Sequence, residues 1–478
     1  MKKIVNNKLY IILLIPILLF LIKGIVFGVD LGFLLSEGKY VLNNGIPNID
    51  PLTFHNGLSF IMHQWLTSIF FYLIYNYIGK LGLIILELLM ILLINIILYK
   101  LCKLISNKKE LSIIISTIIT TVIVLFNYID IRPQIFTYFL LILFIYIIES
   151  YKKKNSKIIY LLPLISIIQI NLHAAMYSFL YIFTIPFIIE IIIKKELKKN
   201  KLILIIIFIS IISGLINPYG IKAITYILYS SDKSINILVP EMHHPSFFTI
   251  EYLLFTIIVF INFITYMYYY RKYKNIKISY ILLLFESILL FFIAPKSYIF
   301  IYIFGIYPIS YYLKDVKLSK KKILYLNYIY HIIIIPMIVL LLLTIILLNK
   351  NIYLNKDKDI INATKYLKDN YNIKEIKPYN TRNIGPYLEY IGIKPYIDTR
   401  AELFIYKMNK KKDISNEYLN IITGKTNIDK FNKKYNFTHL IYYKENDINY
   451  YKNKINNYRL IYNKNNIKIW IRKDLYKQ

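Results

Sequence analysis

Acidic residues and cysteine are both scarce in this sequence. Its 478 residues include 27 Asp and Glu against 59 Lys and Arg, and the only cysteine is Cys102. A single cysteine excludes an intrachain disulfide and a cysteine-based metal site. The net charge of +32 does not indicate nucleic-acid binding, because no nucleic-acid-binding module is recognisable and the basic residues cluster between apolar runs. We expect membrane lipids, through their anionic headgroups, to be the counterpart of this charge.

The sequence also lacks a repeat of fixed period, and no small-residue cleavage site precedes Asp30. The first apolar run, at about 9–28, follows a basic start. Without a cleavage site, this pattern predicts a membrane anchor rather than a signal peptide.

Apolar runs dominate the first 350 residues. The chain is 57% hydrophobic, and stretches of Leu, Ile, Phe and Tyr recur at about the 20-residue length that crosses a bilayer. They predict a polytopic α-helical membrane protein with about 11 transmembrane helices. We expect residues 1–349 to form the transmembrane domain, with a first outer loop at 29–80. Residues 350–478 are expected to form a small extracytoplasmic α/β domain.

The basic residues orient the predicted spans. If 61–78 lies in the membrane interface, with Trp65 at headgroup depth, the next span is 81–101 and all later basic loops face the cytoplasm. These loops are 152–157, 194–201, 271–277 and 314–322. The protein is therefore expected in the cell membrane, with its N-terminus cytoplasmic and its C-terminal domain outside.

The C-terminal segment contains short mixed elements. A helix is predicted at 361–371. An ion pair that ends a strand is predicted between Asp398 and Arg400, with binding of a polar glycan as the alternative. The expected strands are 375–379 and 394–398, separated by a break at Gly385 and Pro386, then 439–443 and a pair within 459–472 with a turn at 463–466.

The first outer loop holds the leading candidate for catalysis. Asp30 directly follows the first span, where an ionisable group is costly and is a functional candidate by default. Its carboxylate can accept a proton from a hydroxyl or hold a divalent cation, and an interfacial cap at a helix end is the structural alternative. Asp50 is a candidate for substrate binding, and with Asp30 for Mg²⁺ or Mn²⁺, although an Asx turn before Pro51 explains it almost as well. Glu37 is expected on a solvated face.

Further candidates for substrate binding follow in the other predicted outer segments. Arg132, in the turn NYIDIRPQ, offers a fork of donors to phosphate, with an ion pair to Asp130 as the structural alternative. A packed core histidine is the alternative for His173, and snorkelling is the alternative for Lys296. The complete set, besides Asp50, is His63, Gln64, Arg132, Asn171, His173, Glu241, His243 and Lys296.

Several of these motifs together resemble a known family. An Asp after the first span, the loop ending HQWL, the RPQ turn, NLHAA and an acidic residue in a later outer loop are similar to bacterial multi-pass glycosyltransferases of the GT-C superfamily. The resemblance is to the branch related to protein mannosyltransferases and to RgtA/B/C/D-like lipopolysaccharide transferases. The chain departs from that pattern where Leu31 and Gly32 follow Asp30, and where Pro386 replaces a tail glycine.

The resemblance implies a GT-C-like fold and a hexosyl or pentosyl transferase. The enzyme would move a sugar, with inversion, from a polyprenyl-phosphate donor to an envelope glycan, lipid or protein acceptor at the outer face of the membrane. Asp30 would match the catalytic carboxylate, and Arg132 would bind the lipid phosphate. Two other classes stay open: a transporter or lipid flippase with the same polar cavity, and a non-catalytic membrane scaffold.

Overall fold

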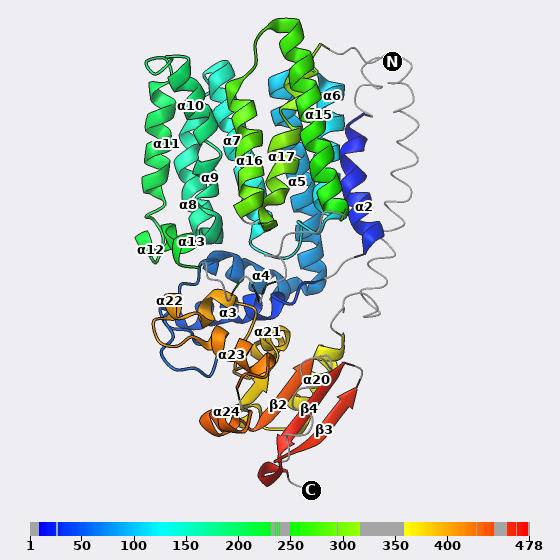
Figure 1. Ribbon diagram of the computed structural model, residues 1–478, viewed down its shortest axis with the longest axis vertical. Coiled ribbons are helices and arrows are strands. Elements are labelled where there is room, and N and C mark those ends of the chain that lie inside the picture. The colour runs from blue at the N-terminus through cyan, green and yellow to red at the C-terminus, as the bar shows by residue number, and fades with distance from the viewer. Residues whose placement is uncertain are drawn as a thin grey trace. The chain divides into compact units, whose positions relative to one another are not determined.

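The computed structural model describes most of the chain as two compact units (Figure 1). Unit 1 comprises Met1–Ile25, Lys80–Gly220 and Glu241–Tyr353, and unit 2 comprises Val26–Gly79, Ile221–Pro240 and Leu354–Gln478. The residues described are 9–24, 27–230, 235, 237, 239, 249–293, 295–315, 358–426, 428–443, 457–464 and 466–476.

Unit 1 is a bundle of apolar helices that run side by side (Figure 1). α5 packs against α6 and α7, α8 packs against α7 and α11, and all eight residues of α17 are buried. The principal helices are α2 (Ile15–Lys23), α5 (Lys80–Ser106), α6 (Lys109–Leu125), α7 (Gln134–Lys154), α8 (Leu162–His173), α10 (Ile185–Ile193), α11 (Lys201–Ser213), α15 (Ile250–Tyr273), α16 (Ile278–Ile293) and α17 (Ile299–Ile306). Shorter segments are η1 (Leu9–Leu14), η2 (Lys157–Leu161), η3 (Ala174–Met176), α9 (Phe179–Ile182), η5 (Pro295–Tyr298) and α18 (Ile309–Tyr312).

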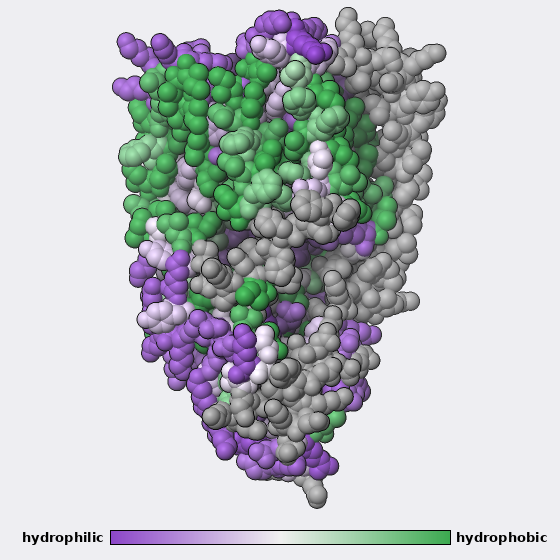
Figure 2. Space-filling model, viewed as in Figure 1, coloured by the Kyte–Doolittle hydropathy of each residue, from purple (hydrophilic) through white to green (hydrophobic). Residues whose placement is uncertain are grey.

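The outer surface of unit 1 is apolar. Figure 2 shows hydrophobic residues covering its helices, with hydrophilic residues at one end of the bundle. Phe208, Phe260 and Phe263 are each more than 60% exposed. Among the described residues, four helical stretches are long and apolar enough to span a membrane: Lys80–Ser106, Gln134–Lys154, Lys157–Met176 and Tyr252–Tyr273. An exposed apolar surface of this extent is typical of helices that contact lipid.

Unit 2 contains the first loop of the sequence analysis. α3 (Leu31–Asn44) and α4 (Trp65–Ile78) pack together closely. Their approach is so close that a Cβ on Gly38 would lie only 2.1 Å from the Ser68 carbonyl oxygen. α21 (Gly385–Ile391) packs on α3 in the same way, since a Cβ on Gly32 would lie 2.3 Å from the Pro386 carbonyl oxygen. Glycine is therefore required at both positions for the helices to approach this closely.

The C-terminal part of unit 2 is a four-stranded sheet with helices. The strand order is β1-β2-β4-β3, with β1 parallel to β2 and the other pairs antiparallel. The strands are β1 (Pro378–Asn380), β2 (His439–Tyr443), β3 (Tyr458–Lys464) and β4 (Ile467–Arg472). The other elements of unit 2 are α12 (Ile221–Ile224), α13 (Tyr226–Tyr229), α20 (Lys358–Asn370), η6 (Ile373–Glu375), η7 (Arg382–Ile384), η8 (Ala401–Phe404), α22 (Tyr406–Asn409), α23 (Ile414–Ile422), α24 (Ile428–Tyr435) and η10 (Lys473–Leu475).

Most of the predicted C-terminal elements are confirmed. The helix at 361–371, the strand at 439–443 and the strand pair near 459–472 are present. The strand predicted at 394–398 is wrong. There the Tyr396 N–H and the Ile397 carbonyl bond to the side chain of Asn380, at 2.8 and 2.7 Å, so a side chain takes the place of a partner strand.

Candidate functional site

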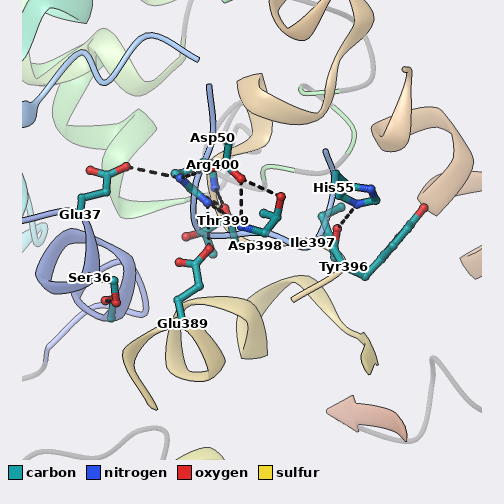
Figure 3. A network of polar contacts seen from close by, with 12 residues as sticks. Ser36, Glu37, Asp50, His55, Glu389, Tyr396, Ile397, Asp398, Thr399 and Arg400 are labelled. Carbon is teal, nitrogen blue, oxygen red and sulfur yellow. Dashed lines mark hydrogen bonds and ion pairs between the residues drawn. The ribbon is translucent and has the colours of Figure 1, made fainter. Parts of the chain in front are cut away.

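The densest group of charged side chains in unit 2 surrounds Arg400 (Figure 3). Its Nη2 atom lies 2.6 Å from Asp398 Oδ2 and 2.8 Å from Glu389 Oε1. Its Nη1 atom lies 2.9 Å from Asp50 Oδ1 and 3.6 Å from Glu37 Oε1. All five side chains are at most 1% exposed. The ion pair predicted between Asp398 and Arg400 is thus one part of a cluster with four carboxylates.

Distant segments supply this cluster. Glu37 projects from α3 and Glu389 from α21, while Asp398 and Arg400 lie in the loop before η8. The Arg400 N–H donates to Asp398 Oδ1 at 2.6 Å, which fixes the loop locally. The aromatic ring of Phe60 lies 5.2 Å from the guanidinium carbon and closes one side. The cluster therefore ties the first loop to the C-terminal segment within unit 2.

Burial changes the protonation of the cluster. It raises the pKa of Glu37 to about 7, against the opposing effects of Arg400 and of the hydrogen bond from Ser68. Burial also raises the pKa of Glu389 well above its usual range, although Arg400 opposes this. Arg400 is itself desolvated, but the attraction of Asp398 and Glu389 prevails and its pKa is raised, so it stays charged. The raised pKa values of Glu37 and Glu389 favour their protonated forms, which lowers the repulsion among the acids around the guanidinium.

Asp50 is a structural carboxylate in this arrangement. Its Oδ1 pairs with Arg400, and its Oδ2 accepts from the Thr53 N–H at 2.9 Å and the Thr53 hydroxyl at 2.7 Å. This is the Asx turn considered from the sequence, reinforced by an ion pair. Because both oxygens are engaged and buried, Asp50 does not fit a Mg²⁺ or Mn²⁺ site. In the described part of the chain, no group of three or more His, Cys, Asp or Glu is placed to hold a metal ion.

Gln64 and His63 lie beside the cluster. The Gln64 amide donates to Glu37 Oε2 at 3.5 Å, so Gln64 is a buried neighbour of the ion pairs. His63 Nδ1 is 3.9 Å from Glu402 Oε1, and its ring lies 4.5 Å from the ring of Tyr226. Burial lowers the pKa of His63 to about 3, so the imidazole is neutral at pH 7 and its contact with Glu402 is not an ion pair.

Asp30 differs from the other acidic residues of the first loop. It precedes α3 at the N-cap position and is partly exposed. Glu37 and Asp50, by contrast, are buried against Arg400. Among the three acidic residues of this loop, Asp30 is the one that is not buried.

In unit 1 the predicted site residues gather at one end of the bundle. At the end of α2, the Lys23 ammonium donates to the Val124 carbonyl at the end of α6, at 2.9 Å. The turn that follows α6 contains Arg132, and the Tyr128 ring in that turn lies 5.2 Å from the Tyr298 ring of η5. Lys296 belongs to η5, so its backbone lies at this end as well.

Arg132, His173 and Asn171 all contact other protein groups. Arg132 Nε lies 3.5 Å from Asp130 Oδ2, the ion pair considered as an alternative, with both side chains 22% exposed. His173 Nδ1 is 2.9 Å from the Thr137 hydroxyl and is buried near the start of α7. The Asn171 amide donates to the Ile216 carbonyl at 2.9 Å. Arg132 is the more accessible of the three. Glu241 and His243 lie outside the described residues.

The sequence analysis missed Glu37 and Glu389, and its prediction of a solvated Glu37 is wrong, since that residue is fully buried. A signal was available for Glu37. It follows Leu34 by three residues and precedes Val41 by four, so it lies on the apolar face of α3. Its partner Arg400 is too distant in sequence for a local pattern to reveal.

Comparison of the sequence with known protein families and with curated proteins gives no match.

Proposed function

We propose that the protein is a membrane glycosyltransferase that moves a sugar from a polyprenyl-phosphate donor to a cell-envelope acceptor at the outer face of the cell membrane. The observation that carries the proposal is the distinction among the acidic residues of the first loop. Glu37 and Asp50 are buried in the cluster around Arg400, whereas Asp30, seven residues after the end of α2, is partly exposed. This is the position at which the GT-C resemblance expects the catalytic carboxylate.

The chemistry assigned to Asp30 is general-base catalysis. The acceptor oxygen bonds to the anomeric carbon as the bond from that carbon to the phosphate oxygen breaks. The acceptor proton passes to Asp30, and the departing polyprenyl phosphate keeps the electron pair. Such a displacement inverts the anomeric centre and needs no covalent enzyme intermediate. Stabilisation of the departing phosphate is the role proposed for Arg132, whose guanidinium matches phosphate oxygens.

The proposed topology supports this assignment. We propose about eleven spans, with 61–78 in the interface. Lys23 contacts the last turn of α6, and Asp30 follows it by seven residues. The basic segments collect at the other end of α6, where their lysines line one cavity with Asn107, and they are expected to face the cytoplasm. The end of α2 thus lies at the end of unit 1 that has fewer basic segments.

A reconstitution experiment tests the proposal. Purified protein in liposomes would be supplied with lipid-linked sugars extracted from the source cells, together with an envelope acceptor fraction. We expect the intact protein to release polyprenyl phosphate and Asp30→Asn to lower that release at least a hundredfold. Asp369→Asn, the same chemical change at an exposed position of α20, serves as the matched control. A transporter would move the lipid-linked sugar across the bilayer without releasing polyprenyl phosphate, and that result would overturn the proposal.

A further inference from the structure

We infer that unit 1 binds a phosphate-bearing anion in a lysine-lined cavity at one end of its helix bundle. The cavity has a volume of about 360 Å³, within the size range of small-molecule pockets. It is lined by the ends of α5, α7 and α10 and by the segments that flank α16 and α18. The inference concerns a second site and does not depend on sugar transfer.

Each of the four basic segments contributes a lysine to this cavity. The lining lysines are Lys152, Lys153, Lys194, Lys277 and Lys314. Two long apolar helical stretches separate each segment from the next along the sequence, so convergence at one end of the bundle follows from an up-and-down arrangement. Asn107, which also lines the cavity, precedes α6, and Lys23 contacts the far end of that helix. The cavity is therefore about 25 Å along α6 from the end near Arg132.

Carboxylates offset only part of the lysine charge. The cavity is lined by five lysines and three glutamates, a formal excess of two positive charges. Glu190 is buried and accepts from both Lys152 and Lys194, at 2.6 and 2.8 Å. Glu149 is buried 4.0 Å from Lys277. These contacts account for two of the carboxylates and three of the lysines.

The ammonium groups of Lys153 and Lys314 contact neutral groups, which leave their positive charge in place. The Lys153 ammonium donates to the Asn107 amide oxygen at 2.9 Å and to the Leu104 carbonyl, which are both neutral acceptors. The Lys314 ammonium lies 4.2 Å from the centre of the Tyr311 ring, and Lys277 lies 4.6 Å from the same ring. Tyr311 thereby holds two ammonium groups at the wall of the cavity without cancelling their charge.

A phosphate group fits these features better than a single carboxylate. Several ammonium groups on different helices present donors from several directions, and lysine binds phosphate as a point charge. The cavity opens at the end of helices whose sides are apolar, where lipid headgroups lie if these helices span a bilayer. Basic pockets of this kind between transmembrane helices bind anionic headgroups. A lipid headgroup and a free phosphate compound share this chemistry.

The test compares two double variants of the full-length protein. Lys153→Gln with Lys314→Gln removes the two lysine charges whose contacts described above are with neutral groups. Lys198→Gln with Lys199→Gln removes two exposed lysines of a neighbouring basic segment that do not line the cavity. Both changes lower the net charge by two, so a general electrostatic effect would be the same in each. If the loss of the Lys153 hydrogen bonds impairs folding, the binding of Lys314→Gln alone is measured in place of the double variant.

Binding is measured with two probes in neutral detergent. Phosphatidylglycerol binding is followed by native mass spectrometry, and inorganic pyrophosphate binding by calorimetry. We expect at least one probe to bind the intact protein and the control equally, and to bind the cavity variant at least tenfold more weakly. Binding of the lipid alone identifies a headgroup as the source, whereas binding of pyrophosphate identifies a free phosphate compound. Equal binding by the cavity variant and the control, or no binding of either probe, would overturn the inference.

Discussion

Arg400 and Asp50 are separated by 350 positions in the sequence, yet Arg400 Nη1 and Asp50 Oδ1 lie 2.9 Å apart in the buried centre of unit 2. Asp398, Glu389 and Glu37 complete the group around the same guanidinium. This arrangement gives these four acidic residues, two from the first loop and two from the C-terminal segment, a structural role. It also leaves Asp30 as the partly exposed acid on which the proposed chemistry depends.

Replacing the central arginine tests the structural role of the cluster. Arg400→Met leaves four carboxylates buried without their cation, and breaking a buried ion pair in this way costs about 3–5 kcal/mol. We expect a marked fall in the thermal unfolding temperature of the full-length protein in detergent. Arg459→Met, at an exposed arginine of β3, is the matched control. Equal unfolding temperatures for the two variants would show that the cluster does not stabilise unit 2.

The protonation of Glu37 predicts a pH dependence of stability. Its pKa is about 7 in the folded protein and about 4.5 when exposed, so between these values the folded state binds more protons. Its contribution to stability therefore decreases as pH rises from about 4.5 to 7. Glu37→Gln removes this titration. The unfolding free energy of the variant relative to the intact protein should rise across that interval and level off above pH 7. A constant difference from pH 5 to pH 8 would contradict the assignment.

The close contact of α3 with α4 predicts a steric effect at Gly38. A Cβ there would meet the Ser68 carbonyl oxygen at 2.1 Å, which only a shift of backbone can relieve. Overpacking of this kind costs about 1–3 kcal/mol or more. Gly38→Ala should therefore lower the unfolding temperature, although alanine favours helix. Lys39→Ala, at the next and exposed position of α3, should leave that temperature nearly unchanged. Similar behaviour of the two variants would contradict the observed packing.

Two variants distinguish the phosphate-binding role proposed for Arg132 from its ion pair with Asp130. Arg132→Lys keeps the charge but loses the planar fork that matches phosphate. If Arg132 binds the donor phosphate, this change should raise the apparent KM for the lipid-linked donor at least tenfold in the reconstituted assay. Asp130→Asn, which removes only the partner at 3.5 Å, should change that KM less. Equal effects of the two variants on this KM would indicate that the ion pair with Asp130, rather than phosphate binding by Arg132, determines it.

Local sequence patterns predicted the elements whose signals are local. The helix at 361–371 has strong apolar periodicity, the strand at 439–443 is a short apolar run, and within 459–472 a turn precedes the alternating stretch 467–472. The stretch 394–398 reads equally well as a strand. Its N–H and carbonyl groups, however, bond to the side chain of Asn380, and no pattern within the stretch itself reveals that partner.

The candidate site was predictable to a similar extent. The sequence indicates Asp30 because an acid after an apolar span is costly, and it indicates the ion pair of Asp398 and Arg400 because the two are close in sequence. It does not show that Asp50 and Glu37 pair with the same arginine. Those contacts depend on how distant segments pack, and the distribution of charges along the sequence does not reveal that packing.

The central claim is tested most directly by mass analysis of cell-envelope glycans and of lipid-linked sugars. The comparison uses cells with the intact protein, with none, with Asp30→Asn, and with the control Asp369→Asn, all at equal membrane abundance. The account predicts that deletion and Asp30→Asn both remove the same sugar from the envelope and accumulate its lipid-linked donor, while Asp369→Asn does neither. If Asp30→Asn cells keep the glycans of the intact strain while deletion alters them, Asp30 is not the catalytic base and the proposed mechanism is wrong.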